Sequence, residues 1–159
     1  MAKPGLHDDP ERTTSIGMAR YAIDFFEAAL AADDKLGDKP GYEIIAPIPV
    51  MFLVGQAIEL ALKAFLLKKG VELRKLRHNF GHDLHRSLRK AKELGLADVV
   101  ALSAEEESVL ALLDALYSTK QLQYIVTGAK TFPVFGPLEA VGRKLVYGIA
   151  PVAGYPPRG

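Results

Sequence analysis

The chain has 159 residues, of which 49% are apolar and 25% charged, and this composition is typical of one globular domain and excludes general disorder. It contains no cysteine, which excludes disulfides, thiolate metal sites and cysteine nucleophiles. The formal net charge is +1, but nine Lys and Arg lie within residues 68–92, and six acidic residues with no base lie within 93–119. This asymmetry favours either an anion-binding face or two solvated helix faces that attract each other.

Residues 1–12 are polar and proline-containing, which predicts a flexible N-terminal arm. They lack the apolar core of a signal peptide, so we expect a cytoplasmic protein. The pattern predicts one helical-bundle domain over residues 13–150 and an irregular tail, PVAGYPPRG, over residues 151–159.

The first predicted helix covers residues 13–36, where apolar residues recur at steps of three and four. The Thr and Ser side chains at 13–15 are candidate N-caps, and Gly37 predicts an end near Leu36. The second covers residues 50–69 and is apolar nearly all round.

The polar exceptions in this second helix lie on one stripe: Gln56, Glu59 and Lys63. Glu59 precedes Lys63 by four residues, the favourable order for a helical ion pair. Charges in the middle of a membrane span cost several kcal/mol, so we predict a buried central helix and no membrane association.

Residues 71–81 are predicted to form a basic connector, and Asp83 to cap the next helix. The apolar stripe of that helix is Leu84, Leu88, Ala91 and Leu94. Ser103 and Glu106 have capping-box spacing and open a long helix predicted to reach about Thr127, with Gly128 as its stop. A last helix is predicted over residues 138–148.

These segments predict an all-α fold, an up-down antiparallel bundle of four to five helices. The common nucleotide, hydrolase and metal fingerprints are absent from the sequence. Three imidazoles, those of His78, His82 and His85, lie close together and suit a metal, but Gly81 separates the first two. We therefore interpret them as cap and surface histidines and predict neither a metal nor a cofactor.

Arg77 and His82 are separated by four residues. Such a pair can cleave RNA without a metal, with the histidine as general base or acid on the 2′-hydroxyl and the arginine stabilising the phosphate. Candidate ligand-binding residues nearby are His78, Asn79, His85, Arg86 and Arg89. The alternative is a solvated basic loop.

Tyr117, Lys120 and Tyr124 follow at steps of three and four late in the predicted long helix. This stripe could stack on a base or bind an anion. The preferred interpretation is a helix face half-buried against a neighbour or a dimer partner.

Two segments resemble the HEPN superfamily, small helical domains linked to nucleotide and RNA functions. GQAIELALKAFLLKKG, residues 55–70, resembles its long helix of the form xxExxLKAxL, and GHDLHRSLRKAKELGL, residues 81–96, resembles its HDLxxL helix. The resemblance implies a four- or five-helix up-down bundle that is usually dimeric. Many members are metal-independent RNases of toxin–antitoxin or phage-defence systems.

The catalytic motif of the family is Arg, a polar residue, three further residues and His, and the segment from Arg77 to His82 fits it. In the family, however, the motif lies near the last core helix, where this chain has KQLQY at 120–124. Members without the motif are regarded as inactive, binding or scaffold versions. We therefore expect a catalytically degenerate HEPN-like protein that binds a nucleotide, RNA or protein partner as a homodimer.

Two alternatives stay open. One is a metal-independent RNase that uses Arg77 and His82, or His82 together with Lys120 and Tyr124. The other is an unrelated helical adaptor whose stripe of Gln56, Glu59 and Lys63 is only a buried network.

Overall fold

The computed structural model describes residues 12–124 and 130–156, which form an all-α fold with no strand among them. This confirms the predicted fold class. The helices are α1 (Ser15–Leu36), α2 (Ile48–Lys68), α3 (Leu73–Lys75), α4 (Leu84–Glu93), α5 (Ala104–Tyr117) and α6 (Phe135–Ile149). A π-helical turn, η2 (Leu76–Phe80), and a 3₁₀ turn, η3 (Leu96–Asp98), flank α4.

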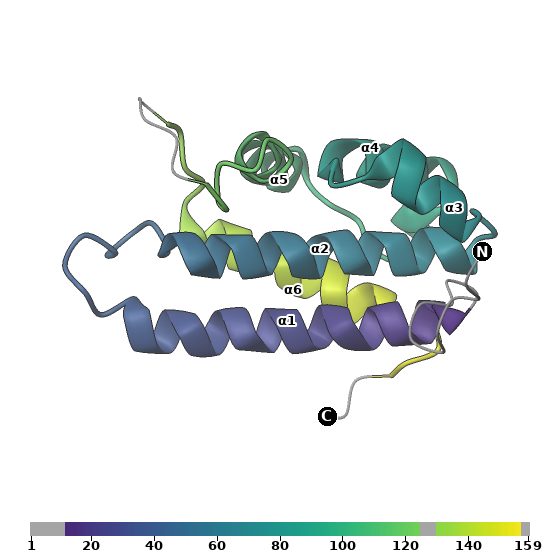
Figure 1. Cartoon of the computed structure of the whole chain (residues 1–159), viewed down its shortest axis with the longest axis horizontal. Helices are drawn as coiled ribbons and strands as arrows, with labels where there is room; N and C mark the ends of the chain where they lie inside the picture. The colour runs from purple at the N-terminus through teal and green to yellow at the C-terminus, as the bar shows by residue number, and fades with distance from the viewer. Residues whose placement is uncertain (1–11, 125–129, 157–159) are drawn as a thin grey trace, which may run out of the picture.

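The central element is α2, which packs against α1, α4, α5 and α6. Figure 1 shows α1 antiparallel beside α2, α6 behind this pair, and α3, α4 and α5 on the other side of α2. By length and composition α2 is apolar enough to cross a membrane, yet 72% of its most apolar stretch is buried inside the fold. Its apolar character is therefore accounted for by contact with other helices.

Three of the six helices in the described residues begin at predicted caps. The Thr14 side chain accepts a hydrogen bond from the Gly17 N–H at 3.0 Å, and Asp83 accepts one from the Arg86 N–H at 2.8 Å. Ser103 and Glu106 form the predicted capping box at the start of α5. Local side-chain chemistry thus determines where three of the helices begin.

The segment 71–81 is not the connector that the sequence predicted, because α3 and η2 form helical turns there. Leu76 is buried in the core and anchors these turns. The last helix also begins earlier than predicted, at Phe135, whose N–H donates to the Ile44 carbonyl at 3.1 Å. In both places a tertiary contact orders a segment whose local sequence pattern is weak.

The prediction that the long helix reaches about Thr127 was wrong, because α5 ends at Tyr117. Lys120 has a left-handed backbone with φ of +62°, and the N–H groups of Lys120 and Gln121 donate to the carbonyls of Tyr117 and Leu116. This hydrogen-bond pair is a Schellman motif, which closes a helix C-terminus. Thr127 and Gly128 lie outside the described residues.

The chain end from Pro151 to Pro156 turns back onto the start of α1 (Figure 1). Ala153 is buried, and its carbonyl accepts a hydrogen bond from the Ser15 hydroxyl at 3.4 Å. Part of the predicted irregular tail therefore packs on the domain.

Candidate functional site

A buried carboxylate on α2 joins three segments of the chain. Glu59 is only 4% exposed. Its Oε1 lies 2.6 Å from His82 Nδ1 and accepts a longer hydrogen bond, 3.3 Å, from the Tyr117 hydroxyl. Its Oε2 lies 3.6 Å from Lys63 Nζ, which confirms the ion pair predicted from the sequence. The charge of Glu59 is thus compensated inside the fold, as a buried carboxylate requires.

Tyr117 reaches this carboxylate because Gly55 leaves room for its ring. A Cβ built on Gly55 would lie 2.5 Å from Tyr117 Cδ2. The Tyr117 hydroxyl donates to Gln56 Oε1 at 2.8 Å, so the polar stripe of α2 and the end of α5 form one network. Burial, and then the negative charge of Glu59, raise the pKa of Tyr117, so its hydroxyl stays protonated as a donor.

His82 is held in place by this network. A carboxylate oxygen can only accept, so the His82 Nδ1–H donates to Glu59, and Nε2 makes no hydrogen bond with the described residues. The ring also packs edge-on against Tyr117, with centroids 6.1 Å apart, and the side chain is 53% exposed. An imidazole oriented by a carboxylate and still open to solvent has the arrangement of a general base or acid.

Arg77 lies on η2 and is exposed. Within the described part of the chain its side chain makes no hydrogen bond or ion pair, and His82 is bonded to Glu59 instead. The sequence pairs Arg77 with His82 by spacing, whereas the structure joins His82 to α2 and α5.

A second feature is a groove of about 780 Å³ that runs from the C-terminal end of α2 past η2 to α4. We call it the basic groove, because its charged lining comprises five cations against Glu72 and Glu93. These cations are Lys69, Lys75, Arg86, Arg89 and Lys90, and His78 and Asn79 also line it. Arg86 Nη1 donates to the Asn79 carbonyl at 2.7 Å and so ties α4 to η2.

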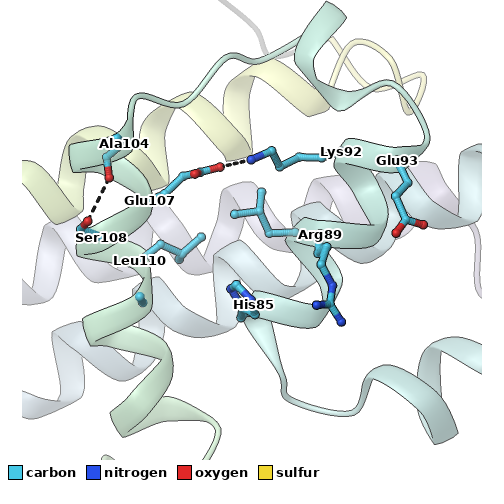
Figure 2. A pocket seen from close by; sticks show the side chains of 10 residues that line it. His85, Arg89, Lys92, Glu93, Ala104, Glu107, Ser108 and Leu110 are labelled. Carbon is cyan, nitrogen blue, oxygen red and sulfur yellow. Dashed lines mark hydrogen bonds and ion pairs between the residues drawn. The ribbon is translucent and has the colours of Figure 1, made fainter.

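A third feature is a cavity of about 500 Å³ between α4 and α5, which we call the α4–α5 cleft. Leu88, Leu110 and the methyl groups of Ala104 and Ala111 give it a mainly apolar lining. Figure 2 shows His85 and Arg89 projecting from α4, and the ion pair of Lys92 with Glu107 bridging the two helices.

The predicted binding residues between positions 78 and 89 thus fall into two groups. His78, Asn79, Arg86 and Arg89 line the basic groove, and His85 lines the α4–α5 cleft together with Arg89. The three neighbouring histidines therefore have different surroundings, and the described residues contain no cluster of three His, Cys, Asp or Glu side chains suited to a metal.

The predicted stripe of Tyr117, Lys120 and Tyr124 does not form. Tyr117 is 5% exposed, Lys120 terminates the helix, and Tyr124, 66% exposed, lies beyond it. Lys69 and Lys90 also line the basic groove, and neither was predicted as a binding residue. The concentration of Lys and Arg over residues 68–92 is the sequence feature that could have indicated them.

The fold and these features define an all-helical domain built on one buried helix, with an oriented histidine and a cationic groove on the same side of that helix. Comparison with known families matches residues 49–130 to the HEPN domain, just over half of the chain. The chain therefore belongs to the HEPN domain family. The matched range contains Glu59, His82, Tyr117 and the whole basic groove. No curated protein and no solved structure gives a match.

Proposed function

We propose that this HEPN-domain protein binds RNA through the basic groove. The observation that carries the proposal is the gathering of five cationic side chains against two carboxylates in one groove. Lys and Arg bind phosphate oxygens by charge-assisted hydrogen bonds, and the release of counterions favours binding. Family membership favours RNA, because the HEPN resemblance implies nucleotide and RNA functions.

Not every cation in the groove is equally available. Lys90 pairs with Glu93 at 3.3 Å, and Arg86 is held by a backbone carbonyl. Within the described residues, Lys75 and Arg89 make no hydrogen bond or ion pair through their side chains. They are therefore the cations best placed to bind phosphates.

The test is binding of a labelled single-stranded RNA between 50 and 200 mM salt, measured by fluorescence anisotropy. Lys75→Gln and Arg89→Gln should each weaken binding and make the negative slope of log K against log salt shallower by about 0.7. The matched control is Lys39→Gln, an exposed lysine in the α1–α2 connector, at the end of the fold away from α3 (Figure 1). It should bind as the unchanged protein does.

Equal binding by all four proteins at every salt concentration would show that RNA does not bind in the basic groove. No RNA binding at all would instead favour a nucleotide or protein partner.

We further propose that the protein acts as a homodimer within a toxin–antitoxin or phage-defence system, because the family resemblance implies both. Light scattering on the purified protein tests the first point. A mass of twice 17.3 kDa supports the dimer, and a mass of 17.3 kDa contradicts it.

The geometry of His82 favours a second candidate, a metal-independent RNase. His82 Nε2 would take the proton of a 2′-hydroxyl, and the 2′-oxygen would attack the adjacent phosphorus. The bond from phosphorus to the 5′-oxygen would break, the 5′-oxygen would take a proton from water, and a 2′,3′-cyclic phosphate would remain. Arg77, which is exposed on η2, would stabilise the charge on the phosphate. The 2.6 Å contact with Glu59 supports the role of His82.

RNA cleavage in EDTA tests this second candidate. His82→Ala and Arg77→Ala should abolish cleavage. Glu59→Gln should reduce cleavage, because a neutral amide stabilises the protonated imidazole less well than a carboxylate does. Arg74→Ala, an exposed arginine one turn before Arg77, is the matched control. Cleavage that is equal in all variants would show that these residues are not catalytic.

A further inference from the structure

We propose that the α4–α5 cleft binds one nucleobase of a single-stranded RNA whose phosphates lie in the basic groove. This inference rests on the proposed RNA binding and adds a second subsite to it. The resulting ligand class is unpaired RNA rather than a duplex.

The lining of the cleft suits the face of a base. Leu88 from α4 and Leu110 from α5 present apolar surface across the cavity. Its volume of about 500 Å³ lies within the range of roughly 300–1,000 Å³ that small-molecule sites occupy. The charges of Lys92 and Glu107 neutralise each other across the cleft (Figure 2). A flat, uncharged aromatic group is therefore favoured in this part of the cavity.

The cleft and the basic groove lie on adjacent faces of α4. Arg89 and Glu93 line both cavities, so they form the ridge between them. The carboxylate of Glu93 is paired with Lys90, which leaves Arg89 as the unpaired charge on this ridge within the described residues. An RNA strand that crosses α4 at Arg89 would place a phosphate on the guanidinium and the neighbouring base in the cleft.

His85 provides a polar contact at the same position. Its ring lines the cleft near Arg89 (Figure 2) and makes no hydrogen bond with the described part of the protein. It can therefore bond a base edge or a 2′-hydroxyl. A base can enter such a cleft only when it is unstacked and unpaired, as in most sequence-specific RNA recognition.

The test compares two labelled oligomers of equal length, a single-stranded RNA and its abasic ribose-phosphate analogue. The unchanged protein should bind the RNA about tenfold more tightly, because burial of one base against apolar side chains contributes an affinity change of that order. Ala111→Leu, which fills the cleft without altering charge, should remove this preference and leave binding of the abasic oligomer unchanged. Lys75→Gln should weaken both ligands equally.

Ala115→Leu is the matched control, since Ala115 is an exposed alanine on the same helix and does not line the cleft. It should keep the preference for RNA, and thermal unfolding should show that both leucine variants are folded. Equal binding of the two oligomers by the unchanged protein, or a preference that survives Ala111→Leu, would overturn the base subsite while the groove proposal stands. Failure to bind either oligomer would overturn both.

Discussion

At the scale of single residues, Gly55 allows the polar network to form. The ring of Tyr117 occupies the space that any side chain at position 55 would need. Gly55→Ala should therefore displace the ring and lower the free energy of unfolding by about 1–3 kcal/mol, the usual cost of overpacking. Denaturant unfolding measures this loss, and a double-mutant cycle with Tyr117→Leu should show a smaller penalty for the alanine. If Gly55→Ala costs the same free energy with Tyr117 or Leu at position 117, the strain does not arise from the Tyr117 ring.

Asp114 on α5 contacts the backbone at the start of α4. Its Oδ1 accepts from the Leu84 N–H at 2.8 Å, beside the cap formed by Asp83. Burial raises the pKa of Asp114, and the Leu84 hydrogen bond only partly opposes this. The folded state therefore binds this proton more tightly than the unfolded chain, so stability rises as the pH falls through the raised pKa towards 3.8.

Asp114→Asn keeps the acceptor and removes the buried charge, so it should be at least as stable as the unchanged protein at pH 7. This advantage should shrink as the pH approaches 4, where the carboxyl of Asp114 becomes protonated. Asp114→Ala should lose about 1 kcal/mol at pH 7, because the Leu84 N–H then lacks a partner. Urea unfolding at both pH values measures these differences. Equal losses for the two variants at pH 7 would show that the acceptor is unimportant.

At the scale of elements, α5 begins at a complete capping box. The Ser103 side chain accepts from the Glu106 N–H at 3.1 Å, and the Glu106 side chain accepts from the Ser103 N–H at 3.0 Å. Glu106 also pairs with Lys144 of α6 at 2.8 Å, and this contact and the Ser103 N–H together lower the pKa of Glu106. The start of α5 is thus tied to a second helix.

Ser103→Ala should cost about 1 kcal/mol of unfolding free energy, because an N–H group of the first turn loses its acceptor. Ser108→Ala is the matched control, since the Ser108 hydroxyl only donates back to the Ala104 carbonyl within the same helix. This change should be neutral or slightly stabilising. Thermal unfolding of the two variants compares them directly, and equal effects would argue against the cap.

At the scale of the whole molecule, the domain depends on one helix, because α2 contacts helices on both of its sides. Leu62 is fully buried, so Leu62→Ala should lower the unfolding free energy by about 2–5 kcal/mol. Leu112→Ala, which truncates a leucine 36% exposed on α5, should cost far less. Helical circular dichroism and tyrosine fluorescence should give coincident unfolding curves for both variants. Separate transitions would show that α3, α4 and α5 unfold independently of α1 and α2.

The amino-acid sequence alone was enough to predict the all-α class, the approximate span of α1 and α2, the caps at Asp83 and Ser103, and the ion pair of Glu59 with Lys63. For α1 it limited the cap to residues 13–15, and the structure places it at Thr14. These features depend on residues three or four apart, and helical periodicity and capping chemistry act over that distance. The resemblance at residues 55–70 and 81–96 also identified the family correctly, because it rests on the same local patterns.

The remaining features depend on how distant segments of the chain pack together. Nothing near His82 in the chain indicates that its ring bonds to a carboxylate 23 residues earlier, or that Tyr117 reaches the same group. The early end of α5 depends on a left-handed lysine, a conformation that sequence patterns assign to glycine. The basic groove likewise needs α2, η2 and α4 to be folded together. Such contacts join residues far apart in sequence, and their free energy exists only when the core has formed.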